Sequence, residues 1–166
     1  MGDFRVNGIE LADCDKNVVA TPLEGKNANI PFVFETVTSL KYKSEGDSEG
    51  IGQTGSPAKS ALVVTESESD IELEISLGER MEFTQHLGPG AGRIRCTVKC
   101  IWQRKGLKTM VVETGDGKGN PGGYCLFTKG IIGAETDNKS KPSCTIGGKC
   151  TDLMENGVSA WQKPPQ

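Results

Sequence analysis

The sequence predicts a mostly β protein, an antiparallel sandwich or open barrel with one short α-helix. Three observations carry this prediction. Apolar and polar residues alternate over several runs, which is the period of a half-buried strand. Segments rich in Gly and Ser separate these runs, and the chain contains 22 glycines. Helix signals are found at one segment, residues 77–87. The 166 residues suit a single domain over 1–166.

Composition narrows the class of protein further. Hydrophobic residues make up 35% of the chain and aromatic residues 5%, so a single copy builds only a thin core. The formal net charge of -3 argues against nucleic-acid binding over the whole surface. We expect no transmembrane helix, because no apolar run approaches 18 residues, and no secretory signal, because no apolar region follows Met1.

The N-terminal segment, residues 1–29, is predicted to be largely irregular. A small hairpin around the Asn7-Gly8 turn is expected over residues 4–11. Residues 13–29 are polar and are predicted to form a loop. A long strand is expected over 30–43, with Phe32 and Phe34 on the same face.

The most unusual feature follows a predicted long hairpin loop at residues 44–60. In the next strand, residues 60–76, every second side chain is acidic. These acidic residues are Glu66, Glu68, Asp70, Glu72 and Glu74. Ile71, Leu73 and Ile75 take the opposite face. The sequence therefore predicts either a functional wall of negative charge or, as the simpler alternative, a solvated outer face.

The predicted helix has signals at both ends. Ser76 can cap its N-terminus with Glu79 as the capping-box partner, and Gly88 can end it. Met81, Phe83 and Leu87 are expected to form its apolar stripe. Further strands are predicted at 93–104, 107–114, 124–135, 143–147 and 149–155, the last two around a Gly147-Gly148 turn. The tail, residues 157–166, is expected to be an extended arm.

The residues give little support to catalysis or metal binding. The chain contains one histidine, His86, with no nucleophile at a recognisable spacing. A straight row of carboxylates lacks the converging oxygens that calcium requires. We therefore expect no enzyme activity, no catalytic residues, no cofactor and no bound metal.

The six cysteines and the lack of a secretory signal point to different compartments. Disulfides are typical of secreted chains, but no secretory signal is visible. Cys96 and Cys100 share a face but lie about 13 Å apart on an extended strand, too far for a disulfide. A two-residue turn would put Cys144 and Cys150 on opposite faces. A zinc site is another alternative for the cysteines, but no Cys-x-x-Cys pair favours it. Cys14, Cys144 and Cys150 lie in or beside predicted loops and are the candidate disulfide cysteines, including links between subunits.

The order of elements around the acidic strand resembles the tail tube proteins of tailed bacteriophages. The resemblance covers roughly residues 30–115. A strand, Phe34 to Lys43, leads to a Gly-rich tip, Gly50 to Pro57, and the returning strand and helix end at Leu87-Gly88-Pro89-Gly90. The chain departs from the pattern after Pro57, where Ala58 to Ala61 replace the glycine or arginine expected at the turn.

The resemblance implies a structural virion protein that assembles into stacked hexameric rings. The inner sheets of the copies would join into one β-barrel, and the tube would conduct DNA without binding it specifically or inserting into a membrane. The 44–60 loop would contact the neighbouring ring through Gly50, Ile51, Gly52, Gln53 and Gly55. The partners implied are further copies of the chain and the tail sheath, tape measure and tail terminator proteins. The location implied is the virion tail, after assembly in the host cytoplasm.

Within this resemblance, the row from Glu66 to Glu74 becomes a hypothetical lining of the lumen that repels DNA toward the axis. Disulfides between subunits would lock the tube after release from a reducing cytosol. Two other functions stay open. One is a secreted or surface β-sandwich binding module with internal disulfides. The other is the tube protein of a contractile injection system, which passes proteins instead of DNA.

Overall fold

The computed structural model of the chain describes residues 5–6, 9–10, 14–52, 54–55, 58–104, 109–135 and 142–165. The elements of these residues follow in chain order: β1 (Arg5–Val6), β2 (Ile9–Glu10), β3 (Cys14–Pro22), β4 (Phe32–Phe34), β5 (Ser39–Gly52), β6 (Lys59–Ser76), α1 (Leu77–Leu87), the 3-10 turn η2 (Ala91–Arg93), β7 (Arg95–Arg104), β8 (Thr109–Thr114), β9 (Cys125–Leu126), β10 (Ser143–Cys150), β11 (Leu153–Glu155) and β12 (Val158–Ser159). The mostly antiparallel β fold with one short helix is confirmed.

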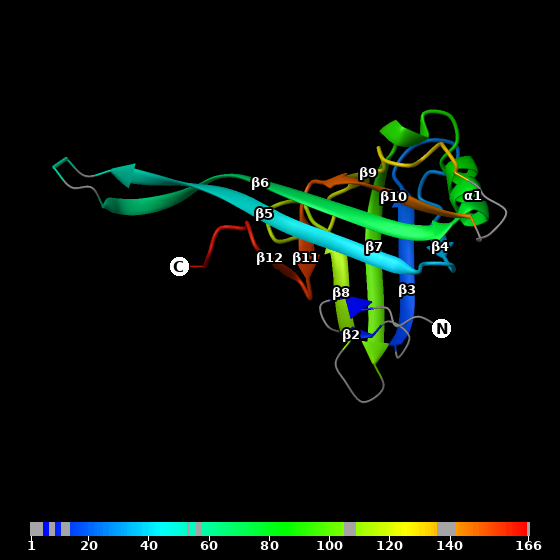
Figure 1. Ribbon diagram of the computed structural model, residues 1–166, viewed down its shortest axis with the longest axis horizontal. Helices are drawn as coiled ribbons and strands as arrows, with labels where there is room; N and C mark the ends of the chain where they lie inside the picture. Colours follow the sequence, from blue (N-terminus) through cyan, green and yellow to red (C-terminus); the bar gives the residue numbers. More distant parts are fainter. Residues whose placement is uncertain are drawn as a thin grey trace.

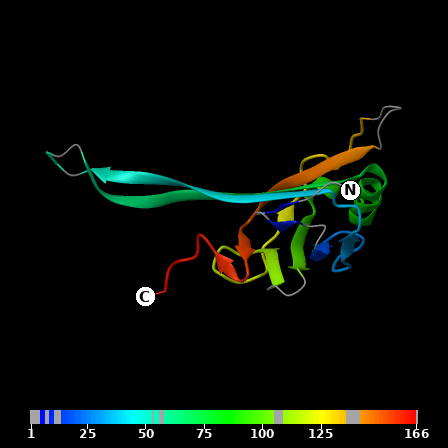
Figure 2. The same cartoon turned by 60° about the horizontal axis from the view of Figure 1, so that its bottom comes forward.

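The strands from β3 to β12 form one 10-stranded sheet that folds into two layers (Figure 1). One layer contains β4, β3, β7, β8, β11 and β12, and the other contains β5, β6 and β10. The two layers meet at β9, which pairs with β10 on one side and with the start of β7 on the other. The long β5–β6 hairpin crosses the strands of the first layer and extends well past them (Figure 2).

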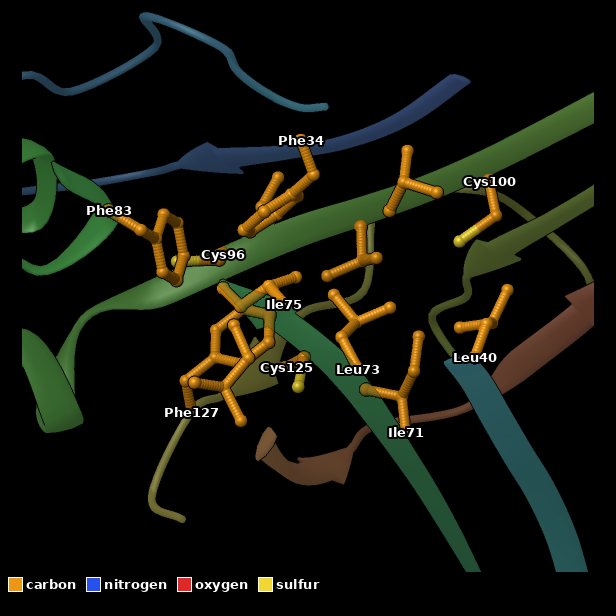
Figure 3. Close-up of a cluster of buried hydrophobic side chains, with 14 of the residues drawn as sticks. Phe34, Leu40, Ile71, Leu73, Ile75, Phe83, Cys96, Cys100, Cys125 and Phe127 are labelled. Carbon is orange, nitrogen blue, oxygen red and sulfur yellow. The ribbon is translucent and has the colours of Figure 1, made fainter. Parts of the chain in front are cut away.

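The core fills the space between the two layers (Figure 3). The second layer contributes Leu40, Leu73 and Ile146 among others, and all three are buried. At one end, Phe83 of α1 packs against rings from other elements, with ring centroids 4.9 Å from Phe34 and 5.2 Å from Phe127. The helix therefore closes the end of the sandwich where the hairpin begins.

The bounds of the helix are as the sequence predicted. The Ser76 hydroxyl accepts a hydrogen bond from the Glu79 N–H at 3.2 Å, and the Gly88 N–H donates to the Thr84 carbonyl at 2.9 Å. Gly88 has a φ of 80°, which favours glycine at this position. Among the described residues, no helix is long and apolar enough to cross a membrane.

The predicted apolar stripe of the helix is only partly correct. Phe83 is buried, but Met81 is 49% exposed. Arg80 is buried instead, and its guanidinium donates to the Ile131 carbonyl at 2.7 Å. This hydrogen bond to the loop after β9 explains how a charged side chain can be buried at this position.

The continuous strand predicted over 30–43 is wrong, because the chain leaves one layer and enters the other within it. β4 pairs with β3, whereas β5 pairs with β6. In between, the Glu79 carboxylate accepts the N–H of Glu35 at 2.9 Å and the N–H of Thr36 at 3.0 Å. The helix thus supplies the acceptors that a neighbouring strand would otherwise provide.

The long loop predicted at 44–60 is mostly paired strand. β5 continues to Gly52 and β6 begins at Lys59, so the described tip is confined to residues 54–55 and 58. The register shifts between Asp47 and Ser48, where β6 carries an extra residue. Gly and Ser are poor strand formers, but pairing of the two long strands overrides that local preference.

The turn predicted at Gly147-Gly148 is also wrong, since β10 runs straight through it. A Cβ atom on Gly148 would lie 1.7 Å from the Leu126 carbonyl oxygen, and one on Gly147 would lie 2.4 Å from the Ile71 carbonyl oxygen. The glycines are needed for close approach of neighbouring backbones and not for a turn.

Two other sequence predictions need correction. Residues 13–29 contain the nine-residue strand β3, which pairs with β7 from Cys14 opposite Arg104 to Pro22 opposite Cys96. The strand predicted at 124–135 shortens to β9. The N-terminal hairpin is confirmed by the pairing of β1 with β2, while its predicted turn residues lie outside the described part of the chain.

Candidate assembly surface

The acidic row lies on the face of β6 that points away from the core. Glu66 and Glu68 are exposed, and Asp70, Glu72 and Glu74 are half-buried. The intervening Ile71, Leu73 and Ile75 are buried, with exposed fractions of 2%, 0% and 0%. The alternation read from the sequence therefore places the two sets of side chains correctly.

Lysines from neighbouring strands flank the inner part of this row. Lys41 and Lys43 of β5 pair directly with Glu72 and Asp70. Lys149 of β10 pairs with Asp70 from the other side. These side chains border a groove of about 710 Å³. Opposite charges therefore face one another across three strands, and this part of the surface is close to neutral.

Two lysines form ion pairs with the row. Lys149 contacts the Glu68 carboxylate, and the Lys129 Nζ lies 3.9 Å from a Glu72 carboxylate oxygen. Hydrogen bonding to Lys149 lowers the pKa of Glu68, and the same bond raises the pKa of Lys149. Because these side chains are well exposed, each pair contributes little to stability. Their main effect is to set the local charge.

Negative charge outnumbers positive charge further along the hairpin, although the Lys43 Nζ lies 3.6 Å from a Glu45 carboxylate oxygen and Lys149 contacts Glu68. Glu45 pairs directly with Glu68, and Asp47 pairs directly with Glu66, so like charges face one another at two positions that are separated by one residue pair. These carboxylates border a second groove of about 540 Å³, which Cys150 also lines. The acidic surface predicted from the sequence is thus concentrated beyond the end of β10.

The hairpin continues past the body as a two-stranded ribbon, here called the hairpin arm (residues 45–68). The pairing of β10 with β6 ends at Cys150 opposite Ser69, so among the described strands only β5 accompanies β6 from there to the tip. Large apolar side chains are nevertheless exposed on both faces of the arm: Ile51 49%, Leu62 73%, Val63 43% and Val64 62%. A two-stranded ribbon with such a surface is marginally stable in water, which favours contact with another molecule.

Four of the five residues predicted to contact a neighbouring ring are described, and these four lie on the hairpin arm. Gly50, Ile51 and Gly52 form the end of β5, and Gly55 lies at the tip with a φ of 81°. Gln53 lies outside the described residues. The apolar residues of β6 opposite them were missed at the sequence level, although the run from Ala61 to Val64 was a visible signal.

The C-terminal residues hold the base of the arm. The Trp161 indole N–H donates to the Ser44 hydroxyl at 2.7 Å, and that hydroxyl lies 2.7 Å from the hydroxyl of Ser69. A Cβ atom on Gly46 would lie 2.5 Å from the Trp161 ring, so glycine makes room for the indole. Part of the predicted C-terminal arm, residues 157–166, is thus folded against its own hairpin.

Of the candidate disulfide cysteines, the two with described side chains, Cys144 and Cys150, do not meet one another. Cys14 begins β3, and its side chain lies outside the described part of the structure. Cys144 and Cys150 are both half-buried and share one face of β10, which corrects the opposite faces predicted. Six residues of extended strand separate them by about 20 Å. The structure brings Cys150 beside Cys125 instead, since the two pair across neighbouring strands.

The single histidine has a structural environment. The Nε2 atom of His86 lies 2.7 Å from the Ile30 carbonyl oxygen, and its ring centroid is 5.4 Å from that of Phe32. Within the described residues, no group of three or more His, Cys, Asp or Glu side chains is placed to hold a metal ion.

Comparison with known proteins gives a match at the level of structure. A chain in the cryo-EM structure of the anti-feeding prophage baseplate, 6-fold symmetrised, superposes with a TM-score of 0.52 and 13% sequence identity. The match covers 86% of this chain and 93% of that chain. No protein-family model matches the sequence, and no curated protein matches it. The chain therefore shares its fold with a component of a phage-like particle.

Proposed function

We propose that this protein is a structural subunit of a tail tube, which assembles into hexameric rings that stack into a conduit for DNA. The sheet of β5, β6 and β10 joins its counterparts in the ring, and the hairpin arm reaches the next ring. The protein has no enzymatic role in this proposal. Its partners are further copies of the chain, with sheath, tape measure and terminator proteins at the surface and ends of the tube, in a virion tail assembled in the host cytoplasm.

The observation that carries this proposal is the uncovered hairpin arm. Leu62 is 73% exposed and Val64 is 62% exposed, so the described part of the same chain covers little of either side chain. β5 is also the last strand in the described order of the sheet. Proteins avoid long exposed edges unless another chain covers them, and closure of six sheets into a ring removes the edge.

The shared fold adds a second line of support. The matching chain belongs to a baseplate particle described with 6-fold symmetry, in which copies surround an axis. The fold suits a subunit whose sheet faces inward and whose helix end faces away from the arm (Figure 1). We propose a similar arrangement of copies around an axis for the present chain.

The distribution of charge fits a channel that lets DNA slide. In the proposed ring, the face of Glu66, Glu68, Asp70, Glu72 and Glu74 lines the lumen. Lysines neutralise its inner part, whereas Glu45 and Asp47 add to its negative charge at the base of the arm. DNA carries one charge about every 1.7 Å of its axis, so a neutral-to-acidic wall avoids trapping it.

A second candidate function is the tube subunit of a contractile injection system, which conducts proteins. The matching anti-feeding prophage baseplate specifically favours this candidate. The two functions share the ring and the arm and differ in cargo. Mass spectrometry and nucleic-acid staining of particles that contain this protein separate them by what the lumen holds.

Electron microscopy of the full-length protein tests the assembly. We expect rings and stacked tubes in wild type, and loss of stacking in the double variant L62K/V64K, because the added charges prevent burial of the arm. I132K is the matched control, since Ile132 is 79% exposed but lies on the body. Sedimentation velocity and circular dichroism would show folded single rings or monomers for L62K/V64K.

Normal tubes from L62K/V64K would contradict the role of the arm. Loss of tubes in both variants would show that assembly responds to any added surface charge, which would also contradict it.

A further inference from the structure

Three cysteines that are far apart in the sequence lie side by side across three strands. Cys125 of β9 pairs with Cys96 of β7 on one side and with Cys150 of β10 on the other. Directly opposed residues on antiparallel strands have Cα atoms about 4.5–5.5 Å apart. A disulfide requires Cα atoms about 4.4–6.8 Å apart, so either neighbour of Cys125 meets this requirement.

Burial and hydrogen bonding distinguish the two neighbours. Cys96 is fully buried, and its thiol donates to the Ile94 carbonyl oxygen at 3.6 Å. Burial raises the pKa of Cys96 to about 12, which keeps it a thiol. Cys150 is half-buried and lines the groove of about 540 Å³ at the base of the arm, so a small reagent can approach it.

The contact between Cys125 and Cys150 also assigns their roles. The Cys125 thiol is fully buried and hydrogen-bonds to Cys150, and this bond is the first cause of the raised pKa of Cys125. Cys150 is the sulfur that attacks first, because the thiolate is the nucleophile and only Cys150 of this pair has access to the groove.

We propose that Cys125 and Cys150 form an intrachain disulfide when the protein meets a small-molecule disulfide. The Cys150 thiolate attacks one sulfur of the reagent and forms a mixed disulfide, and the first reagent thiolate leaves. Cys125 then loses its proton and attacks the Cys150 sulfur, and the second reagent thiolate leaves. The protein is oxidised by two electrons, and the reagent is reduced to two thiols.

This disulfide would join β9 to β10 at the place where the two layers of the sandwich meet. Figure 3 shows Cys125 and Cys96 among the core side chains. The link closes the chain segment from residue 125 to residue 150 and restricts the unfolded state. The inference does not depend on the proposed function, since it requires only the fold of one chain.

The reagent is expected to be selected by charge. Glu45, Asp47, Glu66 and Glu68 border the groove that leads to Cys150. Lys149 lines the same groove, so four carboxylates face one lysine and the groove stays net negative. A cationic disulfide such as cystamine should therefore react faster than the anionic oxidised glutathione, and the difference should shrink at high salt.

Peptide mapping tests the pairing on the full-length protein. A Lys or Arg lies between every two neighbouring cysteines, so trypsin places each cysteine on its own peptide. After cystamine treatment and alkylation under denaturing conditions, we expect the peptide 119–129 linked to the peptide 150–166, and two fewer alkylated cysteines per chain. The oxidised protein should melt on the order of 10 °C higher.

Two variants sharpen the experiment. C150A should lose both the linked peptide and the rise in Tm, whereas C144A, a half-buried cysteine on the same face of β10, should keep both. A link between the peptides 96–99 and 119–129 would overturn the pairing. So would full alkylation of wild type after oxidation, or a disulfide between two chains through Cys150. The wild-type measurement stands even if a variant fails to fold.

Discussion

At the scale of single residues, close backbone approach decides what the sequence tolerates. Gly148 lies in the middle of β10, where its hydrogen takes the place of a side chain next to the Leu126 carbonyl. The neighbouring Gly147 allows the same approach to β6. Both glycines have strand geometry. These positions require glycine because it has no Cβ atom, and not because they need unusual dihedral angles.

We expect Gly148→Ala to destabilise the protein by about 3 kcal/mol, because the added Cβ atom forces β9 away from β10. Gly78→Ala is the matched control. Gly78 is in α1 and its Cβ would meet nothing within 4 Å, so this change should be neutral or should stabilise by up to about 1 kcal/mol. Urea unfolding of both variants measures the difference, and equal stability would show that the approach is not tight.

At the scale of elements, the helix does more than close one end of the sandwich. Glu79 lies in the first turn of α1, but its carboxylate accepts hydrogen bonds from the backbone between β4 and β5. The Ser76 N–H, which a capping box would direct to Glu79, donates to the Thr36 hydroxyl at 3.1 Å instead. The helix N-terminus and the crossing between layers thus stabilise one another.

Glu79→Gln should therefore cost about 1–3 kcal/mol of unfolding free energy, because an amide cannot accept all of the hydrogen bonds that the buried carboxylate accepts. Glu82→Gln, on an exposed position of the same helix, should change stability by less than about 0.5 kcal/mol. Thermal unfolding and hydrogen exchange at residues 35–36 measure the two effects. Unchanged hydrogen exchange at residues 35–36 in Glu79→Gln would show that Glu79 does not stabilise the crossing between the layers.

At the scale of the whole molecule, the body and the hairpin arm differ in what stabilises them. The body encloses a core, while the arm leaves Leu62 and Val64 exposed. The charged face changes in the same direction, from lysine-matched carboxylates on the body to facing carboxylates at the base of the arm. Assembly is thus expected to depend on the arm, and passage of cargo on the charged face.

Removing the unmatched charges should affect passage without affecting assembly. In Asp47→Asn combined with Glu66→Gln, facing carboxylates become neutral and no described ion pair is broken. We expect intact tubes and slower ejection of DNA from assembled particles, because less negative charge repels DNA from the wall. Glu82→Gln with Glu135→Gln removes two exposed charges elsewhere and should leave the ejection rate unchanged. Equal ejection by both variants would place the acidic face outside the channel.

Features that depend on neighbours along the chain were predictable from the amino-acid pattern alone. The period of two from Glu66 to Ile75 fixed which side chains enter the core, and Ser76 with Gly88 fixed the ends of the helix. These predictions hold because strand alternation and helix capping involve residues within a few positions of one another. The fold class followed from the same local signals.

Which strands are neighbours could be read only from the folded chain. It breaks the predicted strand at 35–38, carries β10 through Gly147 and Gly148, and places Lys43 and Lys149 beside Asp70. It also brings Cys125 next to Cys150. Each of these results depends on cross-strand register between distant segments, which a sheet fixes through its pairing and core and which local preferences do not encode.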